Sequence, residues 1–182
     1  MPLAATPLHQ GLDRVLIDAE TLEHRIHELG DELGDEYSDT PPVLVGVLNG
    51  AFIFMGDLSR RMAVPLEVDF MAVSSYGQAT ESSGVVRIVK DLERSIEGRD
   101  VLIVEDIIDS GLTLQYLLDT LQRRNPASLR IVALLRKDKA DAIDVPVDWV
   151  GFDIPDEFVV GYGLDKAGLY RNLPFIAVAQ VS

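Results

Sequence analysis

Three acidic residues stand close together in the middle of the chain, directly after a run of apolar residues. Glu105 and Asp106 follow the apolar segment 101–104, and Asp109 comes shortly after them. A continuous apolar run is typical of a strand that is buried on both faces of a parallel sheet. Because an unpaired charge is costly in such a strand, we expect Glu105 and Asp106 to mark its carboxyl end and to face solvent or a ligand. Ligands of open α/β sheets bind at that edge.

Hydroxyl and glycine residues follow the third acid and supply the parts of an anion site. Ser110 and Thr113 offer hydroxyl groups, and Gly111 between them lets the backbone turn tightly and approach a ligand closely. An amphipathic segment begins here, and the first turn of a helix has free N–H groups that favour a phosphate. An ordinary strand, turn and capped helix is the alternative interpretation of this segment.

Two other predicted strands end in polar residues. The apolar segment 43–48 ends at Asn49 and Gly50 ahead of a predicted helix, which makes this turn a candidate anion loop. The buried strand predicted at 128–135 ends in a basic run, which by the same edge rule puts Lys137 near the ligand. Taken alone, each is also compatible with a plain strand-to-helix turn or a solvated basic turn.

The composition limits the kind of protein. The chain has 182 residues, 47% of them apolar, and strands alternate with helical stretches, so we expect one globular α/β domain. The net charge of −14 argues against nucleic-acid binding, and it means that a polyanionic ligand would need a divalent cation. No cysteine is present and no stretch approaches the length of a membrane span, so we expect a cytoplasmic protein that binds no membrane.

The elements that position these residues are predicted from periodicity. Asp18 is suited to cap an amphipathic helix that follows it. The segments 66–76 and 85–90 have β character and flank a small, polar stretch. They form either a long β-hairpin or a lid that closes over a reactive intermediate. After residue 145 the alternation of strands and helices is lost, which predicts a small C-terminal subdomain over the site.

Residues 105–113, Glu-Asp-Ile-Ile-Asp-Ser-Gly-Leu-Thr, resemble the phosphoribosyl-pyrophosphate (PRPP) loop of the type I phosphoribosyltransferases, in the version of the hypoxanthine-guanine branch. Other motifs resemble the same family and occur in its order. They are Leu48-Asn49-Gly50, Ser74-Ser75-Tyr76-Gly77, Lys137, the segment 158–165 and Tyr170-Arg171-Asn172-Leu173. The resemblance implies a twisted, mainly parallel sheet flanked by helices, with a core at about 38–145. A hood would form from about 1–17 plus 146–182.

The resemblance also implies a PRPP site. Glu105 and Asp106 would hold the ribose hydroxyls and the metal shell. The 5′-phosphate would be bound by Asp109, Ser110, Gly111, Leu112 and Thr113. Pyrophosphate would be bound by Leu48, Asn49, Gly50 and Arg171, and the peptide bond entering Asn49 is often cis in the family. Many relatives carry a lysine or another residue where Asn49 stands, so only the backbone contribution is expected there.

A purine site is implied next to it. Lys137 would donate to the exocyclic oxygen at purine C6, Phe158 would stack on the ring, and the backbone of Val159 would read the base edge. Asp165 would hold a second divalent ion. Asp109 would be the acid or base at the purine nitrogen opposite the attack site. Ser75 and Tyr76 would belong to the mobile loop that closes on PRPP.

The implied activity is Mg²⁺-dependent transfer of the phosphoribosyl group from PRPP to hypoxanthine or guanine, which yields IMP or GMP and pyrophosphate in purine salvage. The family suggests a homodimer or homotetramer. One alternative is a PRPP-sensing regulator of the same fold that binds RNA or a repressor partner. The other is a phosphatase or receiver-like α/β protein with its acids around Mg²⁺, which would not need the segment 158–165.

Overall fold

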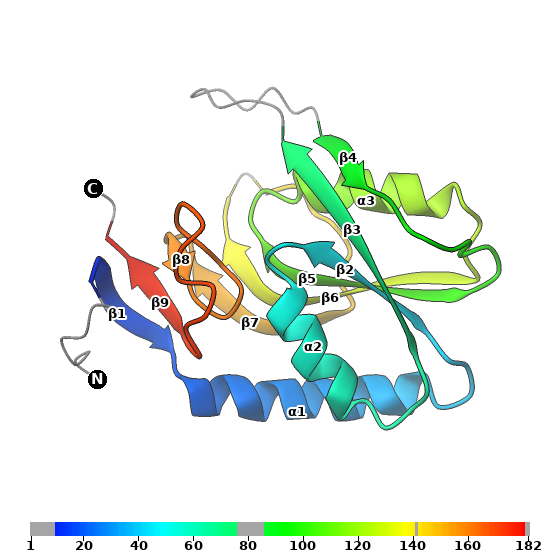
Figure 1. Cartoon of the computed structure of the whole chain (residues 1–182), viewed down its shortest axis with the longest axis horizontal. Helices are drawn as coiled ribbons and strands as arrows, with labels where there is room; N and C mark the ends of the chain where they lie inside the picture. The colour runs from blue at the N-terminus through cyan, green and yellow to red at the C-terminus, as the bar shows by residue number, and fades with distance from the viewer. Residues whose placement is uncertain (1–9, 76–85, 141, 181–182) are drawn as a thin grey trace.

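The computed structural model describes residues 10–75, 86–140 and 142–180, and within them it contains two β-sheets (Figure 1). The larger sheet has the strand order β4-β3-β2-β5-β6-β7, and the smaller has the order β1-β9-β8. The elements are β1 (Leu12–Ile17), α1 (Ala19–Glu36), β2 (Val43–Leu48), α2 (Phe52–Arg61), β3 (Glu67–Ser75), β4 (Val86–Lys90), β5 (Asp100–Ile108), α3 (Leu112–Gln122), β6 (Ser128–Asp138), β7 (Trp149–Pro155), β8 (Val159–Val160) and β9 (Ile176–Ala179).

Five strands of the larger sheet run parallel to one another. β2 pairs in parallel with β3 and β5, and β5, β6 and β7 continue the same direction. β4 is antiparallel to β3, as the predicted hairpin requires. The prediction of a mainly parallel sheet flanked by helices is therefore confirmed, and the carboxyl ends of β2, β5 and β6 meet at one edge.

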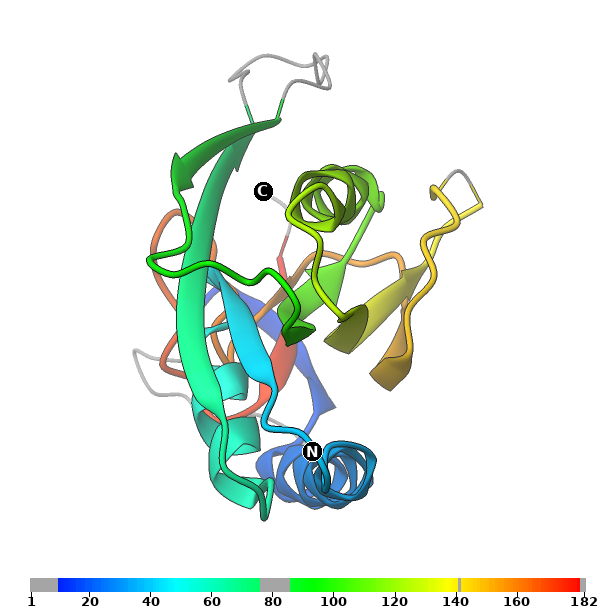
Figure 2. The ribbon, with the colours of Figure 1, turned by 90° about the vertical axis from the view of Figure 1, so that its right-hand side faces the viewer.

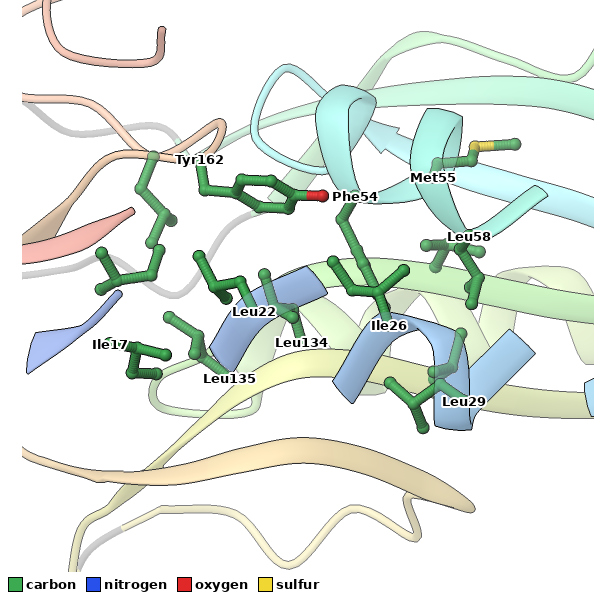
Figure 3. Packing of buried hydrophobic residues seen from close by; sticks show 14 of the residues in the cluster. Ile17, Leu22, Ile26, Leu29, Phe54, Met55, Leu58, Leu134, Leu135 and Tyr162 are labelled. Carbon is green, nitrogen blue, oxygen red and sulfur yellow. The ribbon is translucent and has the colours of Figure 1, made fainter. Parts of the chain in front are cut away.

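Alternate residues of the central strands pack on opposite faces of the larger sheet. Leu102 and Val104 of β5 belong to a buried cluster with side chains of α1 and α2, whereas Val101 and Ile103 belong to a second cluster with side chains of α3. Figure 2 shows α3 on one side of the sheet and α1 and α2 on the other, and Figure 3 shows part of the first cluster. Because both faces are covered, the strand is apolar on both.

Helix α1 begins where the sequence predicts it. The carboxylate of Asp18 accepts a hydrogen bond of 2.8 Å from the backbone N–H of Thr21, which satisfies one free donor of the first turn. The helix continues past Gly30 to Glu36. The missing side chain at Gly30 lets Arg61 of α2 pack closely against α1, because an added Cβ would lie 2.5 Å from Cβ of Arg61. In the described part of the chain, no helix is long and apolar enough to cross a membrane.

The strand that carries the acids is longer than expected. We predicted that Glu105 and Asp106 mark its end, but β5 continues through Ile108, with Glu105 opposite Ala133 and Ile108 opposite Arg136 of β6. This prediction is wrong because the ladder with β6 extends beyond the apolar run. Glu105 therefore lies inside the sheet and is only 6% exposed.

The smaller sheet joins the two ends of the described chain. β1 pairs with β9, and β9 pairs with β8, all antiparallel. In Figure 1 this sheet lies beside one end of the larger sheet, next to the start of α1. The boundary expected for this hood near residue 146 needs a correction, because β7 pairs with β6 and is the last strand of the larger sheet. The chain leaves the larger sheet only after Pro155.

Candidate functional site

The two adjacent acids of β5 serve two different surfaces, because consecutive side chains of a strand point to opposite faces. Glu105 lines a cleft of about 90 Å³ at the start of α3. The carboxylate of Asp106 instead lies against the turn after β2, where a Cβ added to Gly50 would fall 1.5 Å from Oδ2 of Asp106. The acid pair thus joins two parts of the site, one on each side of β5.

The cleft beside Glu105 has the features of an anion site. Asp109, Ser110, Gly111 and Thr113 line it, together with apolar side chains. Gly111 has φ = +78°, and an added Cβ would lie 2.9 Å from the carbonyl oxygen of Ile143. No side chain caps α3 at this residue, so backbone N–H groups of its first turn can reach a ligand. Leu112, the first residue of α3, is exposed.

The second part of the site is a close approach of three segments. Gly50 contacts Asp106 as described, and a Cβ on Gly163 would lie 2.1 Å from the carbonyl oxygen of Gly50. The peptide bond between Leu48 and Asn49 is cis, as the resemblance implies, and Asn49 is exposed. The turn after β2, the end of β5 and the loop after β8 therefore meet where only glycine fits.

Arg171 is tied to the loop after β8. One of its nitrogens, Nη2, lies 2.6 Å from Oδ1 of Asp165, and Nη1 donates to the carbonyl oxygen of Gly163 at 2.5 Å. The charge of Arg171 also lowers the pKa of Asp106, while the charge of Asp165 raises it. Arg171 and Asp165 therefore form a pair that is near enough to Asp106 for their charges to act on its carboxyl group.

The electrostatics of the acid pair are unusual for carboxyl groups. Burial raises the pKa of Glu105 well above its ordinary value, and the neighbouring charge of Asp106 raises it further. Burial raises the pKa of Asp106 to about 6. Such carboxyl groups favour a cationic partner, since a nearby positive charge offsets the cost of keeping them ionised. Within residues 10–75, 86–140 and 142–180, no group of three or more His, Cys, Asp or Glu side chains could hold a metal ion.

Lys137 lies in a network of four charged residues. Its Nζ is 3.6 Å from Oδ1 of Asp109 and 3.2 Å from Oδ1 of Asp156, and its side chain is only 10% exposed. Lys139 contacts the same two carboxylates at 2.7 Å and 3.6 Å. Partial burial favours a higher pKa for Asp109, but the hydrogen bond from Lys139 and the charge of Lys137 outweigh it and lower this pKa.

Lys139 and Asp156 are the members of this network that the sequence analysis missed. A signal existed for Lys139, because it stands two positions beyond Lys137 at the end of a strand and residues so spaced share a face. No local pattern marks Asp156, which follows β7. Its contact with Lys137 depends on the pairing of β6 with β7.

The remaining predicted residues lie in the hood and in β3. Phe158 is 45% exposed, which is unusual for a large apolar side chain and leaves its ring accessible to a ligand. Val159 is buried and pairs with Val178 of β9. Ser75 is the last residue of β3, and Tyr76 lies outside the described residues.

Comparisons with known proteins agree with this arrangement. A family model described as "Phosphoribosyl transferase domain" matches residues 16–167. Hypoxanthine-guanine phosphoribosyltransferase of Bacillus subtilis (strain 168) is 54% identical over 169 residues, which cover 93% of this chain and 94% of that protein. The enzyme of the same name from Mycobacterium avium is 53% identical, with 96% of this chain and 90% of that protein covered. A crystal structure of a hypoxanthine phosphoribosyltransferase from Staphylococcus aureus has a TM-score of 0.92 and 47% identity, and covers 98% of this chain and 97% of that one.

We expect Asp106→Asn to stabilise the ligand-free protein at pH 8. Burial raises the pKa of Asp106 from 3.8 to about 6, so between these values the folded protein binds a proton that the unfolded chain releases. Stability is therefore lost as the pH rises through this window. The variant should gain about 1–3 kcal/mol in unfolding free energy at pH 8 and little at pH 4.

Urea unfolding in the presence of a chelator would measure both values. The exposed Asp119 on α3 offers a matched control, since Asp119→Asn makes the same chemical change at the surface. An equal gain for Asp106→Asn at both pH values would contradict the assignment of a raised pKa.

Proposed function

The chain belongs to the hypoxanthine-guanine branch of the phosphoribosyl transferase family, and on that basis we propose that it transfers the phosphoribosyl group of PRPP to hypoxanthine or guanine. The products are IMP or GMP and pyrophosphate, and the role is purine salvage. The proposal is supported mainly by one observation: the adjacent carboxyl groups of Glu105 and Asp106 face two surfaces, the cleft at the start of α3 and the close contact with Gly50. A sugar that bears phosphate and pyrophosphate groups needs both surfaces.

In this proposal the cleft at α3 binds the ribose 5-phosphate part of PRPP. Backbone N–H groups and hydroxyls from 109–113 bind the 5′-phosphate, because the uncapped start of a helix favours an anion. Glu105 lies next to them in the same cleft and accepts from the ribose hydroxyls. Pyrophosphate lies on the other side of β5, at the turn that contains Asn49 and Gly50, within reach of Arg171.

Mg²⁺ fits the pyrophosphate side of the site. Carboxylates of Asp106 and Asp165 are there, and the raised pKa of Asp106 suits a group that is stabilised by a cation. Glu105, which the resemblance also assigns to the metal shell, lies on the opposite face of β5, next to the proposed ribose position. The described residues do not themselves form a group of three or more ligands, so Asp106 and Asp165 would hold the ion together with oxygens of pyrophosphate and water, as is usual for Mg²⁺. When bound, Mg²⁺ neutralises the charge that develops on the leaving pyrophosphate.

The purine is bound on the side of the Lys137 network. Lys137 donates to the oxygen at C6, Phe158 stacks on the ring and the backbone of Val159 contacts the base edge. A ring nitrogen of the purine displaces pyrophosphate at the anomeric carbon. Asp109 accepts the proton from the nitrogen on the far side of the base, and it is ionised beforehand because Lys139 and Lys137 lower its pKa despite partial burial.

We extend the proposal to the organisation of the protein. One domain contains the PRPP core, and the hood from both ends of the described chain holds the purine. The lid at Ser75 and Tyr76 closes on PRPP. A cytoplasmic homodimer or homotetramer accords with the family. A PRPP-sensing regulator is disfavoured, since the matching relatives are named as enzymes and a net charge of −14 opposes RNA binding.

A spectrophotometric assay with PRPP, Mg²⁺ and each of hypoxanthine, guanine, xanthine and adenine tests this function. We expect turnover with hypoxanthine and guanine, little with adenine, and loss of turnover when a chelator removes Mg²⁺. A regulator would bind PRPP without turnover. Absence of product with every 6-oxopurine would refute the proposed activity.

Asp109→Ala should lower kcat by about 10²- to 10⁴-fold, which is the usual contribution of a general base. The apparent affinity for PRPP should change much less, because the 5′-phosphate keeps the backbone N–H groups of α3. Steady-state kinetics with PRPP and hypoxanthine varied in turn would separate the two effects. Unchanged turnover would remove Asp109 from the role of base.

Lys137→Ala should weaken 6-oxopurine binding selectively, by about 10-fold or more in KM, since a charged hydrogen bond to the base is lost. Lys139→Ala is a matched control, because it removes the neighbouring ammonium group from the same carboxylates without removing the proposed contact to the base. An equal rise in KM for PRPP and for the base would contradict a role of Lys137 in base recognition.

A further inference from the structure

We propose that Tyr162 and Asp57 are positioning residues that hold Asp165 and Arg171 in place above the pyrophosphate loop, residues 48–50. This inference deepens the proposed function and rests on it, because it concerns the residues assigned to pyrophosphate and Mg²⁺. It adds two residues that do not themselves contact the substrate.

A hydrogen bond between Tyr162 and Asp57 joins two segments that are distant in the sequence. The hydroxyl of Tyr162, in the loop after β8, donates a short hydrogen bond to Oδ2 of Asp57. Asp57 lies on α2, the helix that begins directly after the pyrophosphate loop. Figure 3 shows the ring of Tyr162 extending toward α2. The hydrogen bond therefore links the loop that carries Asp165 to the helix that follows Gly50.

Tyr162 is held firmly at its end of the contact. It is only 8% exposed, and it adopts φ = +49°, a conformation that is uncommon for a residue with a side chain. Its backbone N–H donates to the carbonyl oxygen of Leu173 at 2.9 Å. Burial raises the pKa of Tyr162 well above its ordinary value, and the hydrogen bond to Asp57 raises it further. The hydroxyl therefore remains a donor at neutral pH.

The backbone next to Tyr162 connects this residue to the charged side chains of the proposed site. The next residue, Gly163, packs on the carbonyl oxygen of Gly50 and donates its N–H to the carbonyl oxygen of Arg171 at 2.9 Å. The carbonyl oxygen of Gly163 in turn accepts from Nη1 of Arg171, whose other nitrogen pairs with Asp165. A shift of Tyr162 along α2 would therefore move both charged side chains relative to Gly50.

Tyr162 lies outside the proposed substrate site. Together with Asp57 it lines a cleft of about 210 Å³ between α1 and α2, whose other lining residues are Glu23, Ile26, His27, Arg60 and Arg61. None of these residues lines the cleft at the start of α3. Loss of the hydroxyl should therefore affect pyrophosphate and Mg²⁺ binding through geometry, without removing a group that contacts either.

The test is Tyr162→Phe, which removes only the hydroxyl. Isothermal titration calorimetry of the purified protein with pyrophosphate and Mg²⁺ should show binding weakened by about 3- to 10-fold, the scale of one lost hydrogen bond to a charged group. In the assay, KM for PRPP should rise by a similar factor, while KM for hypoxanthine changes less than about twofold.

Three further variants separate positioning from general stability. Tyr37→Phe makes the same change at a buried hydroxyl that has no hydrogen-bond partner in the described structure, and it should leave binding unchanged. Arg60→Ala removes the other partner of Asp57 but keeps the Tyr162 contact, and it should also leave binding unchanged. Asp57→Asn keeps an acceptor oxygen and should restore most of the affinity that Asp57→Ala loses.

A double-mutant cycle completes the test. If the two residues act as one unit, Tyr162→Phe combined with Asp57→Ala should weaken pyrophosphate binding no more than either change alone. Additive effects, or wild-type binding by both single variants, would overturn the inference. Because Asp57 is partly exposed on α2, Asp57→Ala still gives an answer if Tyr162→Phe does not fold. Failure of the unaltered protein to bind pyrophosphate with Mg²⁺ would instead reject the proposed function.

Discussion

Burial of two adjacent carboxyl groups on β5 is the constraint on which the site depends. The ladder with β6 keeps Glu105 buried inside the sheet, Asp106 next to it is half-buried, and burial raises the pKa of each. Their side chains reach opposite faces of the strand, so one strand lines both the cleft at the start of α3 and the contact with Gly50. A bound cation would offset the cost of this burial, so the arrangement that costs stability in the ligand-free protein would also favour a cationic ligand.

Glycine makes the second surface possible. Gly50 and Gly163 come from the turn after β2 and from the hood, and each lies so close to a neighbouring oxygen that a side chain would clash. Close backbone contact leaves no room for water and fixes the hood loop relative to the end of β2. That contact also helps to position Arg171 and Asp165, because Arg171 donates to the carbonyl oxygen of Gly163 and pairs with Asp165.

Competing ion pairs hold the proposed base in the ligand-free protein. Lys137 and Lys139 each contact both Asp109 and Asp156, so neither ammonium group is committed to a single carboxylate. In the proposed function, Lys137 can turn toward a purine oxygen while Lys139 continues to neutralise the two acids. The network also explains how Asp109 can be ionised although it is partly buried.

The sequence by itself determined most of the elements, although it did not predict the strand β1, and it singled out most residues of the candidate site. Apolar runs marked the buried strands, Asp18 marked the start of α1, and residues 110–113 marked the segment that lines the cleft at the start of α3, because these signals depend on neighbouring residues. Only the tertiary structure decided the length of β5, the place of β7 in the larger sheet, and the contacts of Asp156 and Tyr162. Each of these depends on the pairing or packing of segments far apart in the chain, and local composition does not encode the distance between them.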